Sequence, residues 1–494
     1  MQLSSSMKRF LHIAASLAIL VSCGEKSEPQ PQPGGDSRKM ELKLSEETIS
    51  WRACGFNVSV DANFEYKVVI DADWIKPDDG MESTASVQYF LADENPQKAE
   101  RTATLKFQDV NDRYYAKTVT VTQAANESGS GIVDPRLTLS IVDKNATPQT
   151  KALLANLYEI GLKGIMFGHH DDLWYGRYWY NEKGRSDTKE VCGDYPAVLG
   201  IDFAAIADNR HGDKENDYRR RVVLEAYERG EVIIAVLHLN NPQTGSDSWD
   251  NSDKTVVKNI LTEGNSTRKK YLTWLDNLAD FLNNLKSSNG ELVPVILRPY
   301  HEHTQNWSWW GSSCTTDTEF TNFWQFTIKY LRDTKGVHNA LYCISPQTDS
   351  WYGDRTEEHI LFRWPGDDWV DYIGIDCYHG YNPRSLSSYL DALDKIAEKK
   401  KKPCGITEDG KEGFDAADYW TSQVLNPTKG HRASMVCMWR NKYVGTNESD
   451  KHFFSVYPGH VSEADFKKFY ADESTFFSKD LPDMYTMPEG VVVK

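Results

Sequence analysis

Eight short apolar segments, separated by longer stretches of helical character, constrain the fold of this chain more than any other feature. Each segment is continuously hydrophobic, which indicates a strand buried on both faces. The segments are residues 164–168, 197–201, 232–237, 293–297, 340–344, 372–375, 403–406 and 434–438, and the clearest helical stretches are 268–286, 320–332 and 386–399. This alternation predicts a (β/α)8 TIM barrel over residues 136–494. An open doubly wound sheet is the alternative, but no glycine-rich phosphate loop follows the first segment.

Composition and charge limit the classes of molecule that this chain is expected to bind. Of 494 residues, 39% are hydrophobic and 26% charged, so the chain can bury a large core. Lys and Arg total 56 against 72 Asp and Glu, which gives a formal net charge of −16. We therefore expect no nucleic acid partner, because a surface that binds nucleic acid must attract phosphate.

The first forty residues have the layout of an export signal. Lys8 and Arg9 precede an apolar run, 10–21, that is too short to span a bilayer. The run ends in LVSC at 20–23, which resembles a bacterial lipobox. The resemblance implies a lipoprotein signal peptide over 1–22, lipidation of Cys23 and a flexible tether over 23–40. We expect an outer membrane lipoprotein, anchored through lipid at the cell surface and working with glycan-uptake machinery. A periplasm-facing anchor, and ordinary signal cleavage beside an incidental cysteine, are the alternatives.

Residues 41–125 have a different pattern, of short strands with alternating apolar side chains. Segments 56–60, 66–70, 102–107 and 117–122 are the clearest, and turn-rich pieces separate them. They predict a small all-β immunoglobulin-like antiparallel sandwich, followed by a linker over 126–135. The stretches 73–75 and 118–124 resemble the BACON domain, which is often found on surface glycanases. We expect a spacer or interaction module.

Polar side chains follow the apolar segments of the predicted barrel. Chemistry in such barrels gathers at the C-terminal strand ends, so these residues are candidate site residues. In strand order they are His170, Asp202, His238, Arg298 with Glu302, Gln347, Asp376 with Tyr378, Glu408, and Trp439 with Arg440.

Glu302 and Glu408 follow the fourth and seventh segments and are therefore expected to face each other across the barrel mouth. Two carboxylates about 5–5.5 Å apart suit a retaining glycosidase, in which one donates a proton and the other is the nucleophile. Arg298 lies four residues before Glu302, so we expect both side chains on the same face of one strand. Arg298 and a hydrogen bond from Tyr378 are expected to keep Glu408 ionised.

The sequence around these carboxylates resembles glycoside hydrolase family 26. Residues 298–311, RPYHEHTQNWSWWG, are similar to the acid/base motif of that family, and 405–410, GITEDG, to its nucleophile strand. Residues 375–378 and 438–440 are similar to its motifs on strands six and eight. The resemblance implies a mannan endo-1,4-β-mannosidase that cleaves mannan, galactomannan or glucomannan with no cofactor and no metal. A lichenase-like β-glucanase or a β-xylanase is the alternative within the family.

The resemblance also implies a role for each matching residue. Glu302 would be the acid/base and Glu408 the nucleophile, with Arg298 in support. The implied substrate-binding residues are His301 at the sugar bonded at the cleavage point, Trp307 and Trp439 as apolar faces for sugar rings, His238, Asp376 and Tyr378 in the catalytic subsite, Arg440 in the next subsite toward the non-reducing end, and His170 and Asp202 as further candidates.

Two other classes of function fit the sequence less well. The run HHDD at 169–172 suggests a metal hydrolase as an alternative. His301 and His303, however, lie two residues apart, whereas a zincin helix needs histidines at i and i+4. The absence of a CxxC pair also argues against a common structural zinc site. A non-catalytic glycan-binding lipoprotein would be expected to lack one of the two carboxylates, and both are present.

Overall fold

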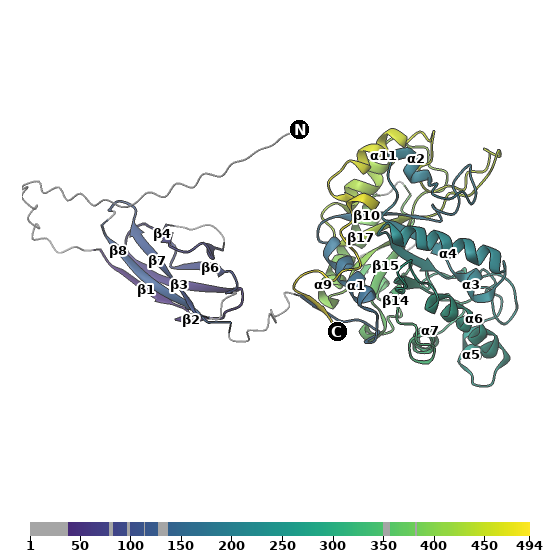
Figure 1. Cartoon of the computed structure of the whole chain (residues 1–494), viewed down its shortest axis with the longest axis horizontal. Helices are drawn as coiled ribbons and strands as arrows, with labels where there is room; N and C mark the ends of the chain where they lie inside the picture. Colours follow the sequence, from purple (N-terminus) through teal and green to yellow (C-terminus); the bar gives the residue numbers. More distant parts are fainter. Residues whose placement is uncertain are drawn as a thin grey trace, which may run out of the picture. The chain divides into compact units, whose positions relative to one another are not determined.

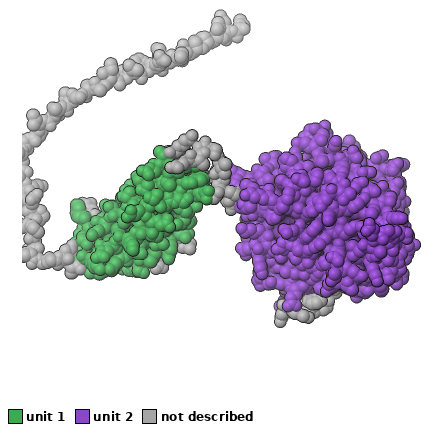
Figure 2. Space-filling model, turned by 90° about the horizontal axis from the view of Figure 1, so that it is seen from below, with its two compact units in different colours: residues 1–132 green, residues 133–494 purple. Residues whose placement is uncertain are grey.

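The computed structural model describes residues 38–78, 83–95, 99–112, 114–126, 137–348, 356–380 and 383–494. The chain forms two compact units that divide after Ile132 (Figures 1 and 2). The predicted signal peptide, Cys23, residues 23–37 of the tether and residues 127–135 of the linker lie outside the described residues. Among the residues that are described, no helix has both the length and the apolar character needed to cross a membrane.

The first unit is a two-sheet sandwich. One sheet has the order β1-β3-β6-β5 and the other β2-β8-β7-β4. The strands are β1 (Met40–Leu44), β2 (Thr48–Ile49), β3 (Cys54–Ala62), β4 (Tyr66–Ile70), β5 (Ile75–Pro77), β6 (Val87–Ala92), β7 (Arg101–Asp109) and β8 (Ala116–Gln123). Alternate residues of β3 and β6 are buried, as period two requires. The all-β prediction is confirmed, but the antiparallel prediction is wrong for one pair. The β2–β8 pair is parallel, because the chain crosses to the second sheet between β1 and β2.

The second unit is a closed parallel barrel, and the predicted fold class is confirmed. Its strands follow one another in chain order from β11 to β17, and β10 pairs with both β17 and β11 to close the ring. The strands are β10 (Ile165–His170), β11 (Val198–Asp202), β12 (Val232–Val236), β13 (Val295–Arg298), β14 (Ala340–Ile344), β15 (Tyr372–Cys377), β16 (Cys404–Asp409) and β17 (Ala433–Met438). Each predicted apolar segment coincides with one of them.

Helices surround this barrel (Figure 1). They are α1 (Pro148–Ile160), α2 (Asp187–Cys192), α3 (Ala204–Asp208), α4 (Asp213–Glu228), α5 (Val256–Leu261), α6 (Ser266–Asn283), α7 (Asp317–Lys329), α8 (Thr356–Ile360), α9 (Pro383–Lys400), α10 (Asn426–Thr428) and α11 (Glu463–Tyr470). The helix α6 begins where the Asn265 side chain accepts a hydrogen bond from the backbone N–H of Thr267 at 2.8 Å. The helix α7 begins with a capping box between Thr316 and Glu319.

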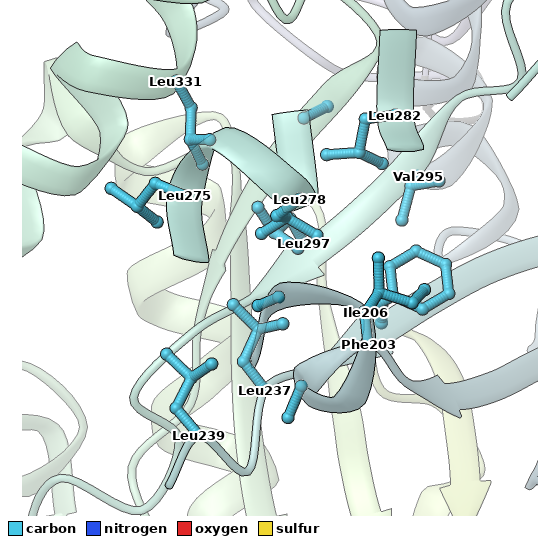
Figure 3. Packing of buried hydrophobic residues seen from close by; sticks show 14 of the residues in the cluster. Phe203, Ile206, Leu237, Leu239, Leu275, Leu278, Leu282, Val295, Leu297 and Leu331 are labelled. Carbon is cyan, nitrogen blue, oxygen red and sulfur yellow. The ribbon is translucent and has the colours of Figure 1, made fainter. Parts of the chain in front are cut away.

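Alternation along each strand separates an outer core from the barrel interior. Leu297 of β13 packs toward the helices, where Leu278 of α6 lies beside it (Figure 3). Its neighbour Ile296 instead joins Ile234 and Leu341 in a second buried cluster. Because successive side chains of a strand point to opposite faces, this pattern also decides which residue at each strand end points into the barrel.

Candidate active site

One side chain from each strand closes the C-terminal end of the barrel interior. On β13, Leu297 faces outward, so the next residue, Arg298, turns inward. The eight residues of this layer are His170, Asp202, His238, Arg298, Ser345, Asp376, Glu408 and Trp439. Hydrogen bonds, ion pairs or ring contacts join each of them to at least one other member of the layer. All of them except Ser345 were predicted. Gln347, which was predicted from strand five, bonds instead to the side chain of Gln305.

Glu408 is buried among partners that stabilise its charge. Its Oε1 accepts a hydrogen bond from Nη2 of Arg298, and its Oε2 accepts one from the Tyr378 hydroxyl at 2.6 Å. Both expected contacts are therefore present. Burial alone would raise the pKa of Glu408, but the charge of Arg298 and the hydrogen bond from Tyr378 hold this pKa below its usual value. These contacts therefore favour the ionised form of Glu408.

A β-bulge brings Glu408 into the barrel. The register between β15 and β16 shifts so that Ile375 lies opposite Ile406 whereas Asp376 lies opposite Glu408. Thr407 is the extra residue, and its hydroxyl donates to Asp376 Oδ1 at 2.6 Å. Without the bulge, strict alternation after Thr407 would turn Glu408 toward the helices.

Asp376 anchors the other side of Arg298. It accepts hydrogen bonds from Arg298 Nη1 at 2.7 Å, from the Ser345 hydroxyl at 3.2 Å and from Thr407. Burial raises the pKa of Asp376, against the opposing charge of Arg298. Arg298 is fully buried and bridges the two carboxylates, so Glu408 has little freedom to move.

Glu302 reaches the same site from beyond the strand end, and the prediction that it shares one strand face with Arg298 is wrong. The strand β13 ends at Arg298, and both Tyr300 and Glu302 have a φ of 52°, which breaks the alternation. Tyr300 is buried, whereas Glu302 is held over the barrel by two bonds. Its backbone N–H donates to the Ser345 carbonyl at 2.8 Å, and Trp307 Nε1 donates to its Oε2 at 2.6 Å.

The carboxylates of Glu302, Asp376 and Glu408 come together over the centre of the barrel. One oxygen from each lies within 4.8 Å of the others. Three oxygen ligands could also hold a cation, but two of these carboxylates are already bonded to the guanidinium of Arg298. The arrangement instead offers one bonded carboxylate facing a second that is partly exposed, as nucleophilic attack and proton donation require.

Aromatic and histidine rings line the cleft above this centre. Trp439 lies over His170 and His238, with ring centroids 4.7 Å and 5.6 Å apart. The ring of His301 lies 4.3 Å from that of His238 and 5.4 Å from that of Trp307. Burial lowers the pKa of His170 to about 3 and that of His301 well below its usual value, so both rings are neutral. Neutral rings can exchange hydrogen bonds with sugar hydroxyls.

Asp202 belongs to the same layer, and Arg440 follows Trp439 in the chain. Asp202 Oδ2 lies 3.2 Å from His238 Nδ1, and its Oδ1 accepts from the backbone N–H of Ala204 at 2.8 Å. Burial alone would raise the pKa of Asp202, but the hydrogen bond and charge of His238 lower it. Arg440 Nη1 donates to the Tyr175 hydroxyl at 3.2 Å. The structure therefore gathers every predicted barrel residue at one end of the barrel.

The run at 169–172 does not act as one cluster. His169 Nδ1 lies 3.0 Å from Asp172 Oδ1, on the opposite face of β10 from His170. Alternation therefore divides the histidine pair that suggested a metal hydrolase.

Sequence reasoning missed several residues of the cleft. Ser345 and Thr407 fix Asp376, Tyr175 bonds Arg440, and Trp249 is 65% exposed with its ring 4.6 Å from that of Trp307. Period-two alternation along β14 would have indicated Ser345, because it follows Ile344, which faces the helices. Tyr175 and Trp249 lie in loops, where no periodicity indicates which way a side chain points.

Comparisons with known proteins agree with this geometry. The model of glycosyl hydrolase family 26 matches residues 142–441, and that of BACON, described as a putative binding domain, N-terminal, matches residues 57–124. A β-mannanase of family 26 from Bacteroides ovatus has a solved structure that is 39% identical, covers 69% of this chain and 98% of that chain, and has a TM-score of 0.65. A modular endo-β-1,4-mannanase from Cellulomonas fimi is 28% identical, covers 72% and 81%, and has a TM-score of 0.64.

A sequence relative is named mannan endo-1,4-beta-mannosidase. It comes from Bifidobacterium adolescentis and is 28% identical over 381 residues, which cover 72% of this chain. The chain spans only 37% of the length of that relative.

Proposed function

The chain belongs to glycosyl hydrolase family 26, and from this we propose that it hydrolyses β-1,4-mannosidic bonds in mannan, galactomannan or glucomannan with retention of configuration. The carboxylate pair carries the proposal. Oxygens of Glu302 and Glu408 lie within 4.8 Å of each other, close to the spacing of about 5–5.5 Å at which one carboxylate attacks the sugar while the other protonates its leaving group. The names of the family relatives supply the substrate class.

The proposed reaction has two displacements. Glu302 gives its proton to the glycosidic oxygen while an oxygen of Glu408 bonds to the anomeric carbon, so the leaving sugar departs as an alcohol. Glu302, now a carboxylate, then takes a proton from water, and the resulting nucleophile displaces Glu408 from the same carbon. Two inversions retain the configuration. Trp307 Nε1, at 2.6 Å from Glu302, orients the carboxyl for both steps.

The surrounding residues suit a neutral sugar chain. We assign Trp439 to one face of the ring at the catalytic subsite, because it lies over the uncharged His170 and beside His238. His301 and Trp307 stand at Glu302 and would contact the sugar that leaves. Arg440 lies beside Trp439 and would bind the next sugar on the other side.

Two substitutions test the carboxylate roles. Glu408→Ala should abolish turnover on every substrate, because no covalent intermediate can form. Glu302→Ala should still release an activated aryl leaving group in a burst and then stall, and azide should accelerate the second step and give a β-glycosyl azide. An α-glycosyl azide, or inverted products from the wild type, would overturn the retaining mechanism.

Product profiles on mannan, glucomannan, lichenan and xylan test the substrate. Release of oligosaccharides from mannan and glucomannan alone supports the mannanase assignment. Faster release from lichenan or xylan would replace it with a β-glucanase or β-xylanase on the same carboxylate pair.

We also propose that Cys23 is lipidated and anchors the protein to the outer membrane at the cell surface, with residues 41–125 as a spacer or interaction module and residues 136–494 as the catalytic domain. The motif at 20–23 supports the anchor. A lipid chain gives membrane affinity without a spanning helix. Cys23→Ala should move the protein from the detergent phase to the aqueous phase with its activity unchanged. A variant that stays entirely in the detergent phase would refute the anchor.

A further inference from the structure

Exposed aromatic side chains of the barrel unit gather at the end that holds the carboxylates. Among its described residues, the exposed aromatic side chains are Tyr178, Tyr180, Trp249 and Tyr443, and all four lie in loops that follow β10, β12 or β17. Large apolar groups exposed together commonly mark a ligand surface. Trp249 packs on Trp307 and belongs to the site described above, and Tyr178 packs edge-on against Tyr457. Tyr180 and Tyr443 have no role so far.

These two tyrosines come from two loops and form a small angled platform, because their ring planes are tilted by 47°. Tyr180 is 43% exposed and Tyr443 is 44% exposed, and their ring centroids lie 5.8 Å apart. The ring of Tyr180 also stacks on that of Tyr175 at 6.1 Å, with planes only 15° apart.

The platform is held in place by its backbone. Tyr175 and Tyr180 form an antiparallel bridge, and within it the N–H of Gly176 donates to the Trp179 carbonyl at 3.0 Å. A further bond joins the two loops, from the N–H of Val444 to the Arg177 carbonyl at 3.1 Å. The rings therefore need little ordering when they bind a ligand.

A continuous line of side chains connects the platform to the catalytic centre. Trp439 lies beside His170 and His238 of the barrel layer, and Arg440 follows it in the chain. Arg440 bonds the hydroxyl of Tyr175, whose ring stacks on Tyr180. A sugar chain that passes Trp439 and Arg440 would reach Tyr180 and Tyr443 next.

The acid/base decides which end of the sugar chain this is. Glu302 protonates the leaving group, so the leaving sugars lie near Trp307, in the loops that follow β12 and β13. The platform lies instead in the loops that follow β10 and β17, and β17 is four strands away from β13. In a β-1,4 chain the leaving group carries the reducing end, so the platform lies on the non-reducing side.

We propose that Tyr180 and Tyr443 form a distal subsite that stacks on a sugar ring of a neutral β-1,4-linked mannan, beyond the subsite at Arg440 on the non-reducing side. This inference rests on the proposed function. The flat faces of phenol rings suit the apolar face of a pyranose. The subsite would bind long chains and leave short ones unaffected.

The test is the chain-length dependence of kcat/KM on β-1,4-mannooligosaccharides. Tyr180→Ala and Tyr443→Ala should each lower kcat/KM on mannohexaose about 3- to 10-fold and change that on mannotriose less than about twofold, since one aromatic contact is worth about 0.5–1.5 kcal/mol. In both variants the cut in mannohexaose should move toward its non-reducing end, because binding modes that reach the distal subsite lose part of their binding free energy. Tyr443→Phe should behave as the wild type.

The matched control is Tyr114→Ala, which removes a tyrosine that is 81% exposed on the sandwich unit. It should leave both substrates unchanged. Equal losses on short and long substrates, or no loss with the cutting pattern unchanged, would overturn the distal subsite while the wild type still cleaves mannohexaose. A wild type that cleaves no mannooligosaccharide would overturn the proposed function and this subsite together.

Discussion

The hydrogen bond from Tyr378 to Glu408 gives the sharpest test of the electrostatic reasoning. Tyr378→Phe removes one oxygen, which donates to Glu408 Oε2 at 2.6 Å, and leaves the ring in place. A hydrogen bond to a charged group contributes about 1.5–3 kcal/mol, and one pKa unit corresponds to about 1.36 kcal/mol. The bond stabilises the ionised form of Glu408, so its loss should raise the pKa of this carboxyl by about 1–2 units.

The assay is the pH dependence of kcat/KM on mannohexaose. This parameter follows the ionisation of the free enzyme, and the nucleophile must be ionised to react. The acid limb of the variant should therefore lie about 1–2 pH units above that of the wild type, and kcat/KM at low pH should fall about 10- to 100-fold.

A matched control lies on the same strand. Tyr372 begins β15 and its hydroxyl lies 2.7 Å from Ser434 Oγ, at the other end of the barrel from the carboxylates. Tyr372→Phe makes the same chemical change and should leave the acid limb where it is. An acid limb that does not move in a folded Tyr378→Phe variant would show that Tyr378 does not control the charge of Glu408.

The remaining predictions concern stability. Arg298→Met leaves two buried carboxylates unpaired and should lower the free energy of unfolding in urea by about 3–5 kcal/mol, and a loss under about 1 kcal/mol would contradict the bridging role. Burial alone would lower the pKa of His379, but Asp409 at 2.8 Å raises it to about 8. Because this pKa lies above the unfolded value of about 6.5, protonated His379 stabilises the folded state fully below about pH 6.5, and this stabilisation is lost as the pH rises through about 8. The free energy of unfolding of the wild type should therefore fall by about 2 kcal/mol between pH 6 and 9, and that of His379→Asn should not. Gly200→Ala would put a Cβ 2.5 Å from the ring of His170 and should cost about 1–3 kcal/mol, measured by urea unfolding, with lower kcat; an unchanged stability would mean that this ring can shift freely.

Local periodicity was enough to predict the barrel and most of the layer of side chains at the C-terminal end of its interior. The apolar segments coincide with β10 to β17 because strands buried on both faces leave a continuous hydrophobic signature in the sequence. Arg298 and Asp376 could be assigned because alternation from an outward neighbour carries the inward direction to the strand end. These inferences use only a few neighbouring residues.

The tertiary structure decided how the site is assembled. Glu302 leaves the strand through residues with positive φ, and Glu408 turns inward only because β16 bulges at Thr407. The pairing of Glu408 with Arg298, 110 positions away in the sequence, could be expected only because the predicted barrel places their two strands around one mouth. Tyr180 and Trp249 depend on loop paths that no period describes. Periodicity carries short-range information, whereas hydrogen-bond partners and loop paths depend on which distant segments the closed barrel brings together.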